Sequence, residues 1–424
     1  MQRSIAIVAL YDLSKRDGFT GHLSYLRNHL ETRGFDVRTF GVASAPPIVP
    51  VDGALEPGYD LGAQSRAALR AIGYVKSARP ALAILTQAGS LINAPLAARL
   101  AAARCPIVYD CLDPAVEFMR NAYGKSSLNA IVQPYLRFSE RVLDRFAKST
   151  WSVSPGLDAL LRGRGWRGTI RRFYNVHNTA QLGTPGASAL RRQPGWERAC
   201  ILVYAGALQP RFRGIETQLE AVARVRARGI DLRFVVLGSS GSDEPFRAHA
   251  RDLEIEDFVQ FLPAVAPNEL ADILRDCDVA VSNSLGYALP SKIFEYIRNG
   301  VRLISIDDGN DVNALCGAFV ELYDGSLESL VTGLASLARR PPEPERIERA
   351  DRFLTDLRAQ NDHAIDEAVE EAAGGGDQAD RPQRSTDLRQ RLEERDDVDD
   401  QHARRSATRP EHPAVRGRID AHVV

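Results

Sequence analysis

The sequence predicts an α/β protein made of two doubly wound domains in tandem. Strand and helix alternate along two stretches of the chain, and the strands are short continuous apolar runs, which is typical of parallel sheets covered on both faces. Residues 179–199 separate these stretches and contain Gly183, Pro185, Gly186, Pro194 and Gly195. At 424 residues the chain is also too long for one ordinary core.

The first stretch opens with a strand at 5–11 and a polar, glycine-containing segment at 12–21. A helix is expected over 22–33, because leucines recur there at helical spacing and Gly34 supplies a stop. The remaining elements expected in this half are strands at 37–42, 82–85, 106–109 and 150–153 and helices at 92–102 and 137–147.

The second stretch repeats the alternation after the glycine- and proline-rich segment. Its expected strands are 201–204, 232–237, 258–262, 279–282 and 302–306, and its expected helices are 215–227, 245–253, 268–275 and 290–299. Helical spacing over 347–372 adds one or two closing helices. The predicted domains are therefore 1–178, a linker at 179–199, 200–345, closing helices at 346–373 and a tail at 374–424.

The tail has a composition of its own. Its 51 residues contain no aromatic residue and no lysine, but many Arg, Asp, Gln and Pro. Such a segment buries too little apolar surface to offset its ordering entropy, so we expect disorder. Translation in a shifted reading frame or a regulatory arm are alternatives, and no chemistry is assigned to it.

Composition excludes several classes of protein. The sequence contains no run of about 18 apolar residues, so no membrane-spanning helix is expected. The apolar stretch at the start is too short for a signal peptide. Cys105, Cys111, Cys200, Cys277 and Cys316 lie far apart, which favours neither a disulfide framework nor a zinc site. A reducing cytoplasm is the expected compartment.

Charge is divided unevenly along the chain. Residues 1–180 hold 23 Lys and Arg against 13 Asp and Glu, a net of +10, so the remainder carries −11 of the total −1. Residues 120–172 hold 11 basic and 3 acidic residues. An anionic ligand or membrane surface could meet this half, and a solvated basic face is the alternative.

The pattern richest in chemistry lies at the start of the predicted helix 290–299. Pro290 is expected near its first position, where free backbone N–H groups and the helix dipole favour anions. Ser291, Lys292 and Glu295 are three and four residues apart and share a face. The hydroxyl and the cation suit a phosphate and the carboxylate suits sugar hydroxyls; an ordinary surface Lys–Glu pair is the alternative.

A second pattern repeats the passage from strand through glycine to helix. Gly206 follows the strand at 201–204, and Arg211 and Arg213 immediately precede the helix at 215–227. Guanidinium groups there could bind a diphosphate through paired hydrogen bonds. Two exposed loop arginines are the alternative.

The first half offers weaker signals. The segment 17–22 contains Gly18, Gly21 and His22 but does not fit GxGxxG, which argues against an NAD-dependent dehydrogenase. Its glycines permit close approach of a ligand; His22 is a candidate base or a helix-surface histidine. Asp110 and Asp113 follow a strand end, where ligands of parallel sheets collect, although Asp113 could simply cap a helix.

Together these stretches resemble the retaining GT-B glycosyltransferases of family 4 (glycosyl transferases group 1). The resemblance spans roughly residues 4–373. Its specific part is Gly206, Arg213-Gly214, Glu220-Ala221, 258–262, Asp278-Val279 and 290–296, and its weaker part is the first glycine segment, Leu26, Leu30, Gly34, Val37 and Asn175.

Three positions depart from the family pattern. Tyr287 occupies the position of the first of the family's paired glutamates, Ala207 that of an arginine, and Asp17 that of the loop's first glycine. These departures leave open a weaker donor site, a different donor or an inactive homologue.

The resemblance implies the GT-B fold, two Rossmann-like domains facing a cleft, with the donor in the second and the acceptor in the first. Arg213 and Lys292 would hold the donor diphosphate, and Glu295 the ribose. The implied catalytic residues are Lys292, Glu295 and Arg213; the donor-binding residues are Gly206, Arg211, Arg213, Pro290, Ser291, Lys292 and Glu295; the acceptor-binding residues are Gly18, Gly21, His22 and Asp113.

The implied activity is transfer of a sugar, with retention, from a nucleoside-diphosphate sugar to a lipid-linked or glycan acceptor in bacterial envelope polysaccharide synthesis. We expect no metal, no separate cofactor and no nucleic-acid partner. The expected location is the cytoplasm, with peripheral contact to the inner face of the plasma membrane. A catalytically inactive nucleotide-sugar or glycan binder and a GT-B sugar-nucleotide epimerase are the alternatives.

Overall fold

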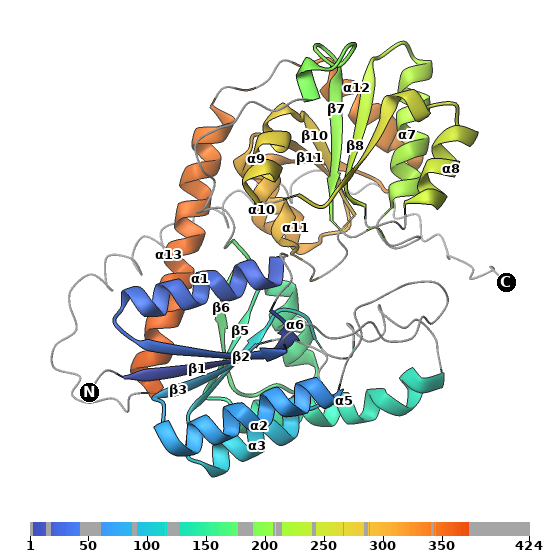
Figure 1. Cartoon of the computed structure of the whole chain (residues 1–424). Coiled ribbons are helices and arrows are strands. Elements are labelled where there is room, and N and C mark those ends of the chain that lie inside the picture. Colours follow the sequence, from blue (N-terminus) through green and yellow to red (C-terminus); the bar gives the residue numbers. More distant parts are fainter. Residues whose placement is uncertain are drawn as a thin grey trace, which may run out of the picture. The chain divides into compact units, whose positions relative to one another are not determined.

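The computed structural model contains two parallel six-stranded sheets, each flanked by helices (Figure 1). Every strand pair in both sheets is parallel, which confirms the predicted fold class. The structure describes residues 3–13, 18–42, 61–86, 91–114, 116, 127–176, 190–206, 208, 214–239, 243–265, 267–283, 287, 289–340, 343 and 345–372.

The first sheet has the order β2-β1-β3-β4-β5-β6. Its central strands are buried along their whole length because helices cover both faces, which explains their unbroken apolar sequences. The strands are β1 (Ser4–Asp12), β2 (Asp36–Val42), β3 (Leu82–Thr86), β4 (Ile107–Cys111), β5 (Ser149–Ser152) and β6 (Thr169–Arg172).

Two layers of helices cover this sheet. One core joins one face of the sheet to α2, α3, α5 and α6, and another joins the opposite face to α1 and the end of α13. The helices of this half are α1 (Gly18–Thr32), α2 (Leu61–Ala78), α3 (Asn93–Ala102), α5 (Ser127–Phe146) and α6 (Pro155–Gly163).

The second sheet has the order β12-β11-β10-β7-β8-β9 and two cores of its own. Its strands are β7 (Cys200–Ala205), β8 (Leu232–Ser239), β9 (Val259–Pro263), β10 (Val279–Ser282), β11 (Arg302–Ile306) and β12 (Val320–Tyr323). Its helices are α7 (Ile215–Ala227), α8 (Glu244–Asp252), α9 (Pro267–Asp276), α10 (Ser291–Arg298), α11 (Asp311–Cys316) and α12 (Leu327–Ala338), with 3-10 turns η2 (Leu190–Arg192), η3 (Glu256–Phe258) and η4 (Gly317–Phe319).

Helix α13 (Arg346–Ala372) belongs to both halves. Its early residues Ala350, Leu354 and Leu357 lie in a core of the second sheet, and its later residues lie in a core of the first. Midway, the buried Asn361 side chain accepts a hydrogen bond from Tyr174 N at 2.6 Å and donates to Tyr174 O at 2.8 Å. These bonds fix the helix to the chain just after β6.

The expected starts of two helices, α1 and α5, were wrong. Helix α1 begins at Gly18 instead of His22, because Phe19 contacts Tyr11 with ring centroids 4.6 Å apart and so holds an extra turn. Helix α5 extends about ten residues before the expected start and continues through Pro134.

Other elements escaped the sequence analysis. Helix α2 buries mainly alanines, which give little hydrophobic contrast, and α6, β6, α11, β12 and α12 are short or lie beyond the last expected strand. The closing segment 347–372 is one helix, α13.

Two further expectations concern the linker at 179–199 and the tail at 374–424. In the expected linker, Leu190 and Trp196 are buried in a core of the second sheet. The tail at 374–424 lies outside the described residues. Among the helices the structure describes, none is long and apolar enough to cross a membrane.

The contact between α1 and α13 contains a titratable cluster. His29 lies 3.0 Å from Asp362 and 3.2 Å from Asp366, while Tyr25 donates to Asp362 and Arg33 pairs with Asp366. Burial alone would lower the pKa of His29, but hydrogen bonds and charges of the two carboxylates outweigh it, so its pKa is raised above 6.5.

This cluster predicts pH-dependent stability. Protonated His29 stabilises the fold fully below its unfolded pKa of about 6.5, and the contribution is lost as pH rises through the raised folded value. Urea unfolding should therefore show that His29→Gln loses more stability at about pH 6 than at about pH 9. An equal loss at both values would contradict the assignment.

Candidate functional site

The second sheet places its site where strand order reverses. Strands β7 and β10 are neighbours, and the chain leaves them for helices on different sides, so their carboxyl ends form a topological switch point. Ligands of open α/β sheets bind at such points. The segments leaving these two strands contain Gly206 and the approach to α10, which are the two strongest patterns in the sequence.

The amino end of helix α10 (Ser291–Arg298) lies at this edge. Pro290 is the N-cap residue, with φ −65° and ψ 139°, one position before the expected place inside the helix. No side chain caps this end, and Ile293 N donates to Pro290 O. The amino end of a helix favours anions because of its N–H groups and its dipole.

Lys292 lies directly against the end of β7. Its ammonium sits 4.1 Å from the centroid of the Tyr204 ring, a cation–π contact that holds the charge beside the strand. A Cβ on Gly206 would lie 3.8 Å from Lys292 Nζ. The two sequence patterns thus converge on one spot.

A buried hydrogen bond fixes this arrangement. Ala205 N, the last amide of β7, donates to the Tyr296 hydroxyl at 2.7 Å, and Tyr296 is fully buried on α10. Burial raises the pKa of Tyr296 well above its ordinary value, so the phenol stays neutral. The bond ties α10, and Lys292 one turn before Tyr296, to the strand end.

Glycine is required at two touching positions here. Gly206 has φ +145°, and Gly238 has φ +106° with a would-be Cβ only 2.4 Å from Gly206 O. Side chains would therefore push the strand ends apart. The open backbone leaves room for a ligand beside Lys292.

The amino end of α7 lies at the same edge of the sheet, against the residue that follows β10. Gly214 is its N-cap with φ +64°, and a Cβ there would lie 1.9 Å from Asn283 Nδ2. Asn283 follows β10, and its Oδ1 accepts a hydrogen bond from Tyr323 OH at 3.1 Å. Asn283 and Tyr323 are thus positioning residues that the sequence analysis did not single out.

The remaining predicted donor residues are placed unevenly. Glu295 is half-buried on α10, one turn after Ser291. Arg211 and Arg213, like Ala207, lie outside the described residues. Their roles stay predictions.

The first half of the chain reaches this edge through Gly18. A Cβ on Gly18, the first residue of α1, would lie 2.7 Å from Ser291 Oγ at the start of α10. A predicted acceptor residue and a predicted donor residue are therefore adjacent, although 273 positions separate them in the sequence.

His22, one turn after Gly18, is buried and paired with Asp110 at the end of β4. Its Nε2 lies 2.6 Å from Asp110 Oδ2, both side chains are buried, and the ring packs edge-on against Phe173 at 5.1 Å. Asp110 ends β4, and its other oxygen has no hydrogen-bond partner among the described residues. The pair fixes the first turns of α1 over the carboxyl edge of the first sheet.

The other predicted acceptor residues differ in surroundings. Gly21 lies within α1, so the expected loop over 17–22 is largely helix. Asp113 is exposed beyond β4. Whether either residue contacts an acceptor stays a prediction.

Tyr287, which departs from the family pattern, contacts the first half of the chain. Its backbone carbonyl accepts a hydrogen bond from Ser154 Oγ at 2.8 Å, and its ring packs against the core of the first sheet. Nearby, Gly156 N donates to both carboxylate oxygens of Asp311, at 3.0 and 2.8 Å. Tyr287 thus joins the halves of the chain.

A model of a known protein family matches the second half of the chain. Residues 188–352 match the family model described as glycosyl transferases group 1. This match covers less than half of the chain. The matched segment contains Gly206, Lys292 and Glu295, so the part of the site on the second sheet lies within it.

A curated relative is similar over a shorter stretch. D-inositol 3-phosphate glycosyltransferase of Stackebrandtia nassauensis is 40% identical over 107 residues, which is 23% of this chain and 24% of that protein. The chain spans between 24% and 50% of the length of such curated relatives.

Solved structures share the whole fold. Sucrose-phosphate synthase of Thermosynechococcus elongatus superposes with a TM-score of 0.65 at 16% identity, over 87% of this chain and 97% of that one. Anabaena HepE in complex with UDP and glucose gives 0.62 at 16% identity, over 87% and 100%. The architecture of the chain is therefore the two-domain GT-B fold.

The buried His22–Asp110 pair predicts strong coupling. Replacing either residue with alanine removes this buried interaction and should cost about 3 kcal/mol in unfolding free energy. The double variant should lose much less than the two single losses together. Urea unfolding of the cycle checks this, with Asp110→Asn as the milder control; additive losses would contradict the pairing.

Proposed function

We propose that the protein transfers a sugar from a nucleoside-diphosphate sugar to a lipid-linked or glycan acceptor, with retention, in bacterial cell-envelope polysaccharide synthesis. The observation that carries this proposal is the position of Lys292. Its ammonium, the start of α10 and Gly206 meet at the switch point of the sheet, within the segment that matches the group 1 family model. Such a site suits a diphosphate.

The chemistry required of this site is stabilisation of a leaving group. As the bond between the anomeric carbon and the diphosphate oxygen breaks, negative charge grows on the diphosphate. Lys292 and the N–H groups of α10 would face that charge without reorganising, because Tyr296 already holds the helix. Arg213, assisted by Arg211, would add guanidinium donors, so the proposal includes no metal.

Other groups would orient the two substrates. Glu295 would accept hydrogen bonds from ribose hydroxyls, one turn beyond the diphosphate. The transferred sugar would lie near the Gly18–Ser291 contact, where the start of α1 approaches the donor side. The acceptor would bind along the first half, near Gly21, His22 and Asp113.

Retention follows from attack on the face that the leaving group vacates. The acceptor oxygen forms the new bond to the anomeric carbon, and its proton passes to the departing diphosphate oxygen. No dedicated side-chain base is needed. Buried and paired with Asp110, His22 would act through the position of α1.

The acceptor class links the protein to a membrane. A lipid-linked acceptor lies at the inner face of the plasma membrane, and the excess of basic residues in the first half favours peripheral contact there. The cytoplasm supplies the donor.

A donor screen tests the proposal. Thermal denaturation is measured with UDP-, GDP- and dTDP-sugars, since a ligand that binds only the folded state raises the midpoint. One donor should raise it, and donor turnover should rise when an acceptor lipid is added. Binding without turnover would indicate an inactive binder, and no response to any donor would contradict the proposal.

Two substitutions test the site itself. Lys292→Ala and Glu295→Ala should each remove a charge-assisted contact of about 1.5–3 kcal/mol and weaken nucleotide affinity roughly tenfold to a hundredfold. Calorimetric titration measures the change, with the exposed Arg339→Ala as the matched control. Unchanged affinity in both site variants would remove the assignment.

A further inference from the structure

We infer that the outward side of α2, α3 and α5 is a docking surface for an anionic lipid bilayer; we call it the basic helical face. Helix α3 contacts both α2 and α5, so the three helices form one layer on the first sheet. Figure 1 shows them together beneath the sheet. This face is separate from the switch-point site.

Exposed apolar side chains gather on this face. Of the seven large hydrophobic side chains that are exposed among the described residues, five belong to α2 and α5. On α5, Tyr135, Phe138 and Phe146 are 37%, 56% and 39% exposed and follow one side of the helix. On α2, Leu61 and Leu69 are 44% and 67% exposed.

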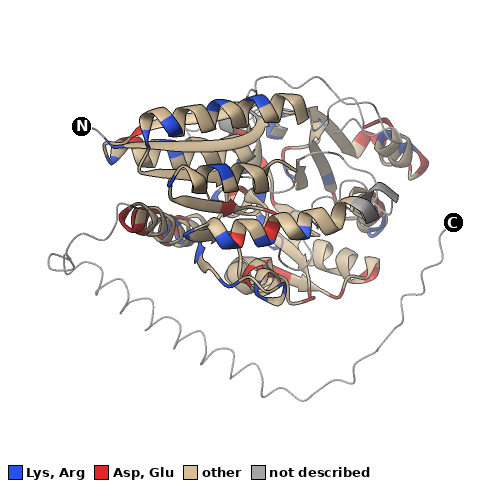
Figure 2. Cartoon of the chain, turned by 90° about the horizontal axis from the view of Figure 1, so that it is seen from below, with Lys and Arg blue, Asp and Glu red and all other residues tan. Residues whose placement is uncertain are grey.

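The charges on the same helices are almost all positive. Helices α2 and α3 contain no acidic residue, and α5 contains two. The basic residues are Arg66, Arg70, Lys76, Arg99, Arg137, Arg141 and Arg145. Figure 2, which views the molecule from this side, shows basic residues along these helices.

Both carboxylates of α5 are occupied internally. Glu140 is buried and accepts two hydrogen bonds from Arg164, at 3.0 and 3.1 Å. Asp144 accepts hydrogen bonds from the backbone N–H groups of Arg167 and Gly168. Neither carboxylate forms an ion pair with Arg137, Arg141 or Arg145 among the described residues, and the three helices keep an excess of basic over acidic residues.

Three arginines of α5 are left for an external anion. Arg137, Arg141 and Arg145 recur every fourth residue, are exposed, and form no ion pair with any residue that the structure describes. This row runs beside the aromatic residues on the same helix. Arginine next to aromatic side chains suits the headgroup region of a bilayer, where rings enter the interface and guanidinium groups bind phosphates.

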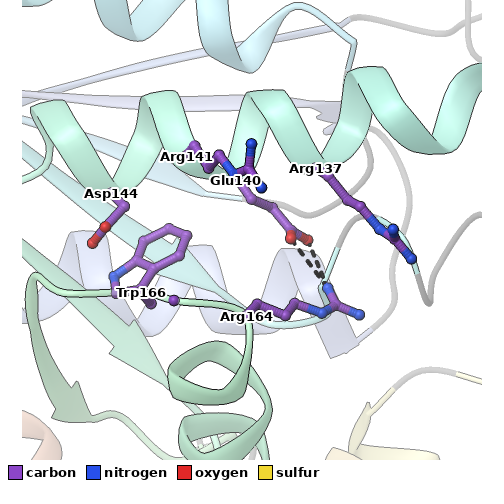
Figure 3. A pocket seen from close by; sticks show the side chains of 7 residues that line it. Arg137, Glu140, Arg141, Asp144, Arg164 and Trp166 are labelled. Carbon is purple, nitrogen blue, oxygen red and sulfur yellow. Dashed lines mark hydrogen bonds and ion pairs between the residues drawn. The ribbon is translucent and has the colours of Figure 1, made fainter.

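A pocket of about 200 Å³ lies along the edge of this row. Arg137, Glu140, Arg141 and Asp144 line it from α5, and Arg164 and Trp166 line it from the segment after α6 (Figure 3). Arg164 in the same wall is already bound by Glu140, so Arg137 and Arg141 are the cations that remain to receive a phosphate. A lipid phosphate between them would hold the face in one orientation.

The opposite side of the same sheet lacks this character. There α13 places acidic residues against basic ones, as in the Arg171–Glu367 and Arg33–Asp366 pairs. On the side of α13, the basic residues named here are therefore paired with carboxylates, unlike Arg137, Arg141 and Arg145 of α5. The positive charge favours a partner with an anionic surface. The exposed aromatic rings favour one with an apolar interior, and an anionic bilayer has both.

This inference concerns where the enzyme works and rests on the proposed function only for its purpose. Docking would place the acceptor half beside lipid-linked acceptors. Vesicle binding does not require sugar transfer, so the two proposals fail separately. A protein that binds vesicles but no donor would overturn the proposed function alone.

Vesicle sedimentation tests the surface. The full chain is mixed with vesicles of phosphatidylcholine alone or of phosphatidylcholine with phosphatidylglycerol. It should sediment with the anionic vesicles, and binding should weaken as salt rises. The variant Arg137→Glu/Arg141→Glu/Arg145→Glu should bind at least about tenfold more weakly.

A matched control separates this face from general charge. Arg192→Glu/Arg198→Glu/Arg339→Glu makes the same change in charge on exposed arginines of the second half and should bind like the wild type. Phe138→Ser should weaken the binding that remains at high salt. All variants should keep the donor-induced rise in melting midpoint.

Two results would overturn the inference. One is equal sedimentation of the wild type with neutral and anionic vesicles. The other is equal loss of binding in the two triple variants, since binding would then follow total charge instead of this face.

Discussion

The site depends on the hydrogen bond between Ala205 N and the Tyr296 hydroxyl. It joins the last amide of β7 to the middle of α10 inside the core, where an unsatisfied amide would be costly. Lys292 is one turn earlier on the same helix and is therefore held beside Gly206 before any ligand arrives. A cation placed in advance stabilises a developing diphosphate without reorganisation energy.

The two halves of the chain meet around this point through few but specific contacts. Ser154 both caps α6, by accepting from Leu157 N, and donates to the carbonyl of Tyr287. Gly18 meets Ser291 at the start of α10. Tyr287, which the resemblance aligns with the first glutamate of the family pattern, thus takes part in a packing contact between the halves. Its ring contributes apolar contact where the family pattern has a carboxylate.

Much of this architecture could be predicted from the sequence, because buried parallel strands have continuous apolar sequences and α10 has a clear start. Helix α2 could not, since its buried face consists mainly of alanine. The His22–Asp110 pair joins residues 88 positions apart, and only the tertiary fold reveals it. Asn283 was likewise invisible, because its importance comes from the missing Cβ of Gly214. Local patterns gave the candidate site residues, and the residues that position them could be found only from the structure.

The most direct test of the central claim is a crystal structure with bound UDP, or with whichever nucleotide the donor screen selects. The account predicts density for the diphosphate at the start of α10, within hydrogen-bonding distance of Lys292 Nζ and the first backbone N–H groups of that helix. A nucleotide bound elsewhere, or a diphosphate pointing away from Lys292, would contradict the account.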